Sequence, residues 1–207
     1  MEKLDLSQLH KSYFSAKANP GMLDVGAASF LSIPGKGDPS GETFALAVQA
    51  LYATAYTVKF ICKSSKRDFV VSKLEGLWWY DEEKFGGLSV DEAPYKVPRS
   101  EWEYRLLIRM PDLVSSVMVE EAKASVVLKK QIPQAEGIEL YPMEEGKCVQ
   151  ILHVGPFSEE PKTLRRLNDF MMANNLMKNG LHHEIYLSDF RKTPPEKLRT
   201  ILREPVK

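Results

Sequence analysis

Tyr104-Arg-Leu-Leu-Ile-Arg-Met-Pro111 decides the fold, because it returns near the end of the chain as Leu198-Arg-Thr-Ile-Leu-Arg-Glu-Pro205. Both copies carry Arg at the second and sixth positions and Pro at the eighth. In the first copy apolar and polar residues alternate, which is typical of a half-buried β-strand. Each copy follows a segment that ends in an acidic residue, Asp81 or Asp189. These matches point to an internal repeat.

The segments before each copy extend the repeat. Phe30-Leu-Ser-Ile-Pro-Gly35 and Ile151-Leu-His-Val-Gly-Pro156 each read as a strand that ends at a Pro/Gly break. Helical spacing follows each break, with Ser40 as the expected cap of the first helix and Ser158 at the start of the second. Another strand comes next in each half, over 69–80 and 182–188. The order strand, helix, strand, strand is therefore written twice.

We predict an α+β fold made of two strand-helix-strand-strand repeats with pseudo-two-fold symmetry and a central ligand groove, because pockets favour such interfaces. Residues 137–143 and 147–154 are expected to form a hairpin around Glu145-Gly146. The predicted division is an N-terminal lead-in segment (1–24) and one domain (25–207). Within that domain we expect repeat one (25–111), a linker helix (112–136) and repeat two (137–207).

Composition narrows the function classes. The 207 residues hold 28 Lys plus Arg and 28 Asp plus Glu, so the formal net charge is zero. A balanced chain gives no electrostatic reason to expect nucleic acid or membrane as partner. The charged start and the lack of a long apolar run indicate a cytoplasmic protein. Cys62 and Cys148 lack metal-ligand spacing and are expected to be buried free thiols; no metal or cofactor is predicted.

Glu184 is the main functional candidate. Alternation over 182–188 places Glu184 on one face with His182, Tyr186 and Ser188. A buried carboxylate without a partner is costly, so Glu184 is either a groove acid or part of a solvent-facing strand or structural ion pair. Tyr186, its neighbour on that face, is either a hydrogen-bond donor to a ligand or ordinary core. His183 faces the other side, so the adjacent histidines cannot share one metal.

Aromatic residues supply candidate walls for the groove. Trp78 and Trp79 are adjacent in a strand and must face opposite sides, but the sequence does not say which one faces the groove. Core packing is the alternative for the aromatic candidates and Met171, whereas His153 stands just before the Gly155-Pro156 break, where a groove could open. The wider candidate set, proposed as ligand-binding, comprises Trp78, Trp79, Trp102, Tyr104, Tyr52, Tyr56, His153, Phe170 and Met171.

From about residue 22 onward the chain resembles the GyrI-like small-molecule-binding domain, in its order of elements, its Gly155-Pro156 break and its strand His183-Glu-Ile-Tyr-Leu-Ser-Asp189. Leu74-Glu-Gly-Leu-Trp-Trp79 and Pro194-Pro-Glu-Lys-Leu-Arg-Thr-Ile-Leu-Arg203 are similar to the stand-alone bacterial subfamily. The resemblance implies a central ligand groove and a small aromatic ligand as partner. Relatives sense drugs, neutralise toxins or inhibit gyrase.

The resemblance also implies a chemistry, because some stand-alone members hydrolyse cyclopropane-bearing, DNA-alkylating natural products in an aromatic cage. Catalysis then needs a base near the reacting carbon and a donor at the ligand carbonyl, roles that suit Glu184 and Tyr186 in either order. Xenobiotic protection by hydrolysis is the first expectation. The alternative is a protein that binds or sequesters flat, often cationic, aromatic molecules without chemistry. Neither reading fixes the physiological substrate or the oligomeric state.

Overall fold

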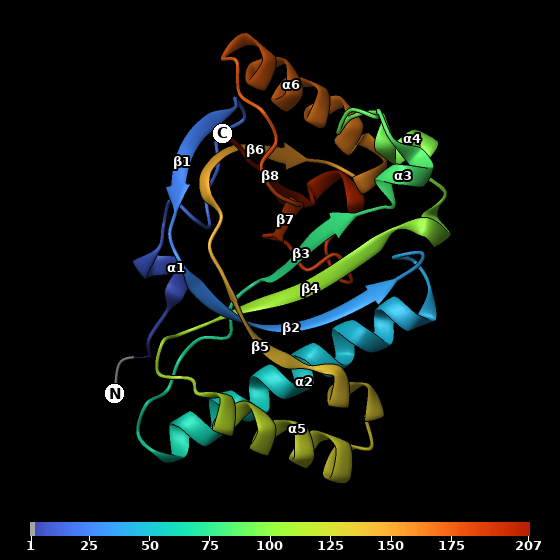
Figure 1. The fold of residues 1–207 in the computed structure, drawn as a ribbon. Coiled ribbons are helices and arrows are strands. Elements are labelled where there is room, and N and C mark those ends of the chain that lie inside the picture. The colour runs from blue at the N-terminus through green and yellow to red at the C-terminus, as the bar shows by residue number, and fades with distance from the viewer. Residues whose placement is uncertain (1–2) are drawn as a thin grey trace.

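One antiparallel sheet organises the structure, a computed structural model that describes residues 3–207. Its eight strands lie in the order β1-β6-β8-β7-β3-β4-β2-β5 (Figure 1). The strands are β1 (Gly21–Val25), β2 (Ala28–Lys36), β3 (Leu74–Trp79), β4 (Glu103–Met110), β5 (Glu139–Met143), β6 (Gly146–Val154), β7 (His182–Tyr186) and β8 (Arg199–Pro205). Within this range the α-helices are α1 (Leu6–Leu9), α2 (Glu42–Ser64), α3 (Glu82–Phe85), α4 (Ala93–Lys96), α5 (Ser116–Lys130) and α6 (Glu160–Ala173).

The predicted repeat is confirmed as β2-α2-β3-β4 followed by β6-α6-β7-β8. Their strands lie in the order β2-β4-β3-β7-β8-β6 from one half to the other, so β3 and β7 meet at the centre. Reversing that order exchanges equivalent strands of the two halves, as a pseudo-two-fold axis between β3 and β7 requires. The α+β class and the symmetry follow the sequence prediction.

The predicted hairpin between residues 137–143 and 147–154 is wrong. β5 pairs with β2 and is one edge strand, whereas β6 lies between β8 and the other edge strand, β1. Gly146 has the positive φ of 66° that a turn signal implies, but the preceding Glu145 is held in the interior by His183 and Arg203. The chain therefore bends through the fold at this point instead of folding back on itself.

A similar bend separates β1 from β2. β1 and β2 are separated by only Gly26 and Ala27, yet β1 pairs with β6 at one edge and β2 pairs with β5 at the other. The lead-in segment thus supplies a strand to the sheet as well as packing on it. The two bent stretches carry the chain from one edge of the sheet to the other twice.

Helices cover one face of the sheet in two groups. α2 packs against β2 and β4, α5 packs against α2 and β5, and α6 packs against β6 (Figure 1). The long helix α2 begins at Glu42 with Gly41 at its N-cap, one residue after the expected cap at Ser40. By length and composition α2 would also suit a membrane span, but its apolar stripe is used here to cover the sheet.

The opposite face is filled by the N-terminal segment. Tyr13 and Phe14 pack against Phe30, Leu107 and Ile185 in a second apolar cluster. A buried polar network crosses this cluster, in which Tyr13 donates to Glu75 and the His183 imidazole lies 3.0 Å from Glu75 and 2.9 Å from Glu145. Cys62 and Cys148 are buried and free, as predicted.

Candidate functional site

The centre of the helix-covered face is built around one cross-strand pair. Gly76 of β3 lies opposite Glu184 of β7. The two residues also hold equivalent positions in the repeats, counted back from Asp81 and Asp189. An equivalent pair that faces itself lies on the symmetry axis, so Glu184 stands where the two halves meet.

Two residues further along each strand stand Trp78 and Tyr186, which meet across the axis. The indole Nε1 of Trp78 donates to the Tyr186 hydroxyl at 3.0 Å. A Cβ on Gly76 would lie 2.9 Å from that indole nitrogen and 3.2 Å from the hydroxyl. Gly76 is needed here because these two rings close over its backbone.

Glu184 receives the next hydrogen bond in this chain. The Tyr186 hydroxyl donates to Glu184 Oε2 at 2.7 Å. Because Trp78 donates to the hydroxyl oxygen of Tyr186, the phenolic proton points toward Glu184. Burial and the Glu184 carboxylate raise the pKa of Tyr186 well above its usual range, so the phenol keeps its proton. Trp78, Tyr186 and Glu184 thus form a directed hydrogen-bond chain with the carboxylate at its end.

His182 supplies a positive charge beside this chain. Its Nδ1 lies 2.5 Å from Glu204 Oε1, and its Nε2 lies 3.4 Å from Glu184 Oε1, close enough for an ion pair but without hydrogen-bond geometry. Burial alone would lower the pKa of His182, but the Glu204 and Glu184 carboxylates outweigh it and raise the pKa to about 10. His182 is therefore an imidazolium between two carboxylates at neutral pH.

Two further carboxyl groups, Glu160 at the start of α6 and Glu204 of β8, were not among the sequence candidates. Both are buried, and each has one oxygen without a hydrogen-bond partner among residues 3–207. Burial and the nearby Glu184 carboxylate raise the pKa of Glu160 well above its ordinary value. Alternation along β8 could have placed Glu204 on this face, whereas Glu160 beside Pro161 looks like a solvent-exposed helix start.

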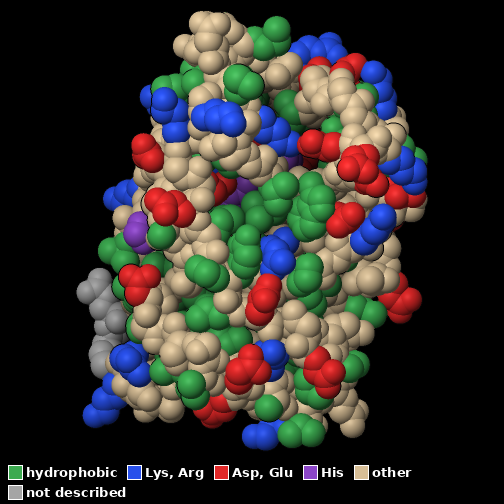
Figure 2. Space-filling model, viewed as in Figure 1, with side chains coloured by type: hydrophobic (Ala, Val, Ile, Leu, Met, Phe, Trp, Pro, Cys, Tyr) green, Lys and Arg blue, Asp and Glu red, His purple; other side chains and the backbone are tan. Residues whose placement is uncertain are grey.

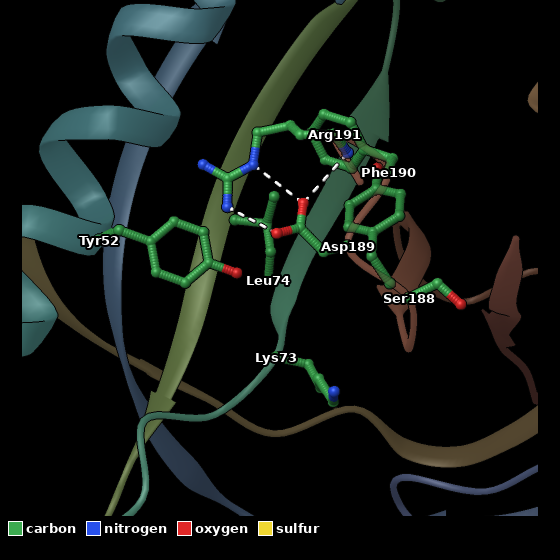
Figure 3. Close-up of a pocket in the computed structure, with 8 residues that line it drawn as sticks. Tyr52, Lys73, Leu74, Ser188, Asp189, Phe190 and Arg191 are labelled. Carbon is green, nitrogen blue, oxygen red and sulfur yellow. Dashed lines mark hydrogen bonds and ion pairs between the residues drawn. The ribbon is translucent and has the colours of Figure 1, made fainter. Parts of the chain in front are cut away.

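A small pocket of about 70 Å³ opens above Tyr186, between α2 and the loop that follows β7. Figure 3 shows Arg191 reaching from this loop toward Tyr52 of α2 while it binds Asp189. The Arg191 guanidinium lies 5.4 Å from the centre of the Tyr52 ring. In the view of Figure 2, hydrophobic side chains gather over the middle of the molecule. The pocket itself is narrow because the loop that follows β7 reaches across its opening.

Contacts between aromatic rings also hold the loop after β7 over the pocket. Phe190 lies 6.1 Å from both Tyr186 and Phe157 between ring centres, and Phe157 lies 5.9 Å from Tyr186. The corresponding loop of the first repeat reaches the other way, where Asp91 accepts from Arg165 of α6 at 3.1 Å. Each repeat therefore extends its long loop over the helix of the other, and the groove between the helices is roofed from both sides.

The remaining strand candidates divide by face. Trp102 and Tyr104 lie on the helix-covered face, with ring centres 6.4 Å and 5.5 Å from Trp78. Tyr104 is fully buried and forms the wall behind Trp78, and Trp102 packs on the edge of the same cluster. Trp79 points to the opposite face, where it donates to Glu103 at 3.1 Å. Trp78 is thus the tryptophan of this pair on the side of Glu184.

The helix candidates are more scattered. Tyr52 lines the pocket, whereas Tyr56 is 47% exposed and lies outside its lining. Phe170 and Met171 pack in the apolar cluster under α6. His153 is buried and binds the Thr163 hydroxyl at 2.9 Å and the Pro156 carbonyl at 3.2 Å, which ties the Gly155-Pro156 break to α6. Tyr52 and Tyr186 therefore line the pocket, and Trp78 and Glu184 are linked to it through their hydrogen bonds with Tyr186.

Solved structures share this architecture. An uncharacterized conserved protein from Listeria innocua is 39% identical with a TM-score of 0.88, and the match covers 99% of this chain and 100% of that one. A hydrolase from Listeria innocua is also 39% identical, with a TM-score of 0.86 and complete coverage of both chains. The EcmrR C-terminal domain, at 9% identity, TM-score 0.57 and coverage of 91% and 97%, shares the fold alone.

No curated protein matches the chain. The family model of the GyrI-like small molecule binding domain matches residues 19–207, which include both repeats and all eight strands. A domain of this family binds small molecules, which agrees with a groove at the junction of the two halves. The chain therefore belongs to the GyrI-like small molecule binding domain family.

Proposed function

We propose that this protein is a cytoplasmic hydrolase that adds water to the electrophilic cyclopropane of a planar aromatic DNA-alkylating compound, and so protects against xenobiotics. The observation that carries the proposal is the Trp78–Tyr186–Glu184 hydrogen-bond chain, whose Tyr186 lines the small pocket between α2 and the loop after β7. The hydrolase from Listeria innocua, at 39% identity over the whole chain, supports an enzymatic reading.

Ligand binding requires a movement of the loop that covers the pocket. Pockets for drug-sized ligands measure about 300–1,000 Å³, well above the volume of about 70 Å³ present here. Phe190 and Arg191 are the side chains to displace, because they close the mouth against Tyr186 and Tyr52. An entering planar ring would replace the contacts of Phe190 with its own, against the rings of Tyr186 and Phe157.

In the proposed reaction, Glu184 takes a proton from a water molecule as the water oxygen attacks the cyclopropane carbon. The ring C–C bond breaks, and its electrons move through the conjugated system to the ligand carbonyl, which becomes a phenolate. Tyr186 gives that oxygen a proton and regains one from protonated Glu184 through their 2.7 Å hydrogen bond. The sum is the addition of one water, with both residues restored.

The test is to incubate the protein with a cyclopropane-bearing alkylator and look for a product heavier by one water molecule. Glu184→Gln should bind the compound and form product at least ~100-fold more slowly, since a general base contributes about 10²–10⁴-fold. Glu159→Gln is the matched control, because Glu159 is an exposed carboxylate that pairs with Lys162. Product formation at the wild-type rate by Glu184→Gln would remove Glu184 as the base.

A binding protein without chemistry is the second candidate. The observation that favours it is the excess of negative charge beside the hydrogen-bond chain, where the two carboxylates of Glu184 and Glu204 flank the single imidazolium of His182. Such a site attracts flat cations, and aromatic faces stabilise them further. Here Glu184→Gln should weaken a cationic dye more than a neutral one of the same shape, and no water adduct should appear with any cyclopropane compound.

A further inference from the structure

A second and larger cavity lies on the other side of the sheet from Glu184. It has a volume of about 230 Å³ and opens between the N-terminal segment, the bend from β1 to β2 and the end of β4. Arg109, Tyr13 and Val25 are its buried members, and His10, Ser12 and Asp24 stand at its exposed rim. None of these residues takes part in the proposed reaction.

Arg109 is the unusual member of this cavity. Its exposed fraction is only 9%, and among residues 3–207 it has no ion-pair partner and no acceptor for its guanidinium. Its one specific contact is with the Tyr13 ring, whose centre lies 4.5 Å from the guanidinium carbon. None of its nitrogens is among the fully enclosed unpaired atoms of residues 3–207, so the guanidinium is open to the cavity. Such a group facing a cavity is suited to bind an anion there.

The repeat shows what an arginine at this position binds. Arg203 is the equivalent of Arg109, at the sixth position of the second copy, and it also stacks on Tyr13, at 4.3 Å. Arg203 donates to the Glu145 carboxylate at 2.9 Å, to Gln150 and to the Tyr13 carbonyl. Arg105, two residues before Arg109, is also paired, with Ser32 and Glu139. Of these three arginines, Arg109 alone has no carboxylate or hydroxyl partner within residues 3–207.

We propose that this cavity binds a small monocarboxylic acid, whose carboxylate lies on Arg109 as the Glu145 carboxylate lies on Arg203. A guanidinium binds a planar carboxylate through two parallel hydrogen bonds. Leu23, Val25 and Ala27 offer apolar surface to a short hydrocarbon body. The volume is below the range of about 300–1,000 Å³ for drug-sized ligands. Asp24 at the rim disfavours ligands with a second negative charge.

The probe is sodium butyrate, titrated into the full chain while the arginine side-chain Nε signals are followed by NMR. The expected result is saturable binding that moves the Arg109 signal, with n-butylamine producing no such shift. Inorganic phosphate, which carries more charge past Asp24, should bind at least about tenfold more weakly. A wild-type protein that shows no saturable Arg109 shift with butyrate would overturn the proposal, as would phosphate binding more tightly than butyrate.

Variants separate this cavity from the groove. Arg109→Gln should lower butyrate affinity at least about tenfold, and Arg109→Lys should retain part of it. Arg105→Gln is the matched control on the same strand and face, and Arg191→Gln removes the cation at the groove; both should bind butyrate like the wild type. Asp24→Asn should bind butyrate more tightly. Unchanged affinity in Arg109→Gln, or loss of binding in Arg191→Gln, contradicts the proposal, and neither outcome depends on hydrolase activity.

Discussion

Gly76 and Glu184 occupy equivalent positions in the two repeats and face each other across the β3–β7 ladder. One copy has no side chain at this position and the other has a carboxylate. A symmetric groove would offer two identical ways to place a ligand. The difference between Gly76 and Glu184 removes that ambiguity, because only one half carries the acid while the other leaves space for the Trp78 and Tyr186 rings.

Gly76→Ala should disrupt the hydrogen bond between Trp78 and Tyr186. The added Cβ would lie 2.9 Å from Trp78 Nε1, so the indole must shift and its hydrogen bond to Tyr186 should be lost. We expect a loss of about 1–3 kcal/mol in the free energy of unfolding, the usual cost of overpacking, and weaker ligand binding. Denaturant unfolding measures the first. Gly21→Ala is the control, since a Cβ there meets nothing within 4 Å.

Replacing Trp78 should weaken turnover or ligand binding, whereas replacing the adjacent Trp79 should not. Trp78→Phe removes the donor that directs the Tyr186 proton toward Glu184, so turnover or ligand affinity should fall by about tenfold. Trp79→Phe loses a hydrogen bond to Glu103 on the other face and should leave ligand binding unchanged. Equal effects of the two substitutions on affinity would show that the ligand does not lie on the face of Glu184.

Stability should fall as the solution becomes alkaline. Glu204 and Glu184 raise the pKa of His182 from 6.5 to about 10, against the effect of burial. A raised histidine pKa stabilises the fold fully below pH 6.5, and that contribution is lost as pH rises through about 10. We expect the free energy of unfolding to drop by roughly 2–4 kcal/mol across this window. His182→Gln should show a shallower dependence, with a residual slope from His183, whose pKa is also raised by Glu145 and Glu75 against burial.

Opening the roof should speed ligand exchange. Phe190→Ala removes the ring that contacts Tyr186 and Phe157, so a ligand no longer has to displace it. Association and dissociation rates, measured by stopped-flow fluorescence, should both rise. Lys192→Ala is the control in the same loop, because the Lys192 side chain is 82% exposed. Rates that stay unchanged in Phe190→Ala would place the entrance elsewhere.

Much of the site could be predicted from local pattern. Alternation over 182–188 places Glu184 and Tyr186 on one face with His182, and the structure confirms this. The same rule puts Trp78 and Trp79 on opposite faces, but a strand's pattern does not say which face receives the helices. That depends on the register of β3 with its neighbours, a long-range property.

The missing parts were non-local. The Glu145-Gly146 turn signal is real, but the partner of each flanking strand is chosen by contacts across the whole sheet, including those of Glu145 with His183 and Arg203. Glu160 lies beside Glu184 only because α6 packs back on the second half of the sheet. The spacing of residues along one segment does not predict contacts with residues far away in the sequence.

The two bent stretches that cross from edge to edge have a consequence for folding. β1, from the start of the chain, completes the sheet of the second half, and β5, from the start of the second half, completes the sheet of the first. Each half therefore depends on the other for its outermost strand, like two partners in a domain swap joined in one chain. A chain cut near Pro111 should yield fragments that do not fold separately but reassociate when mixed, and the intact protein should unfold in a single cooperative transition.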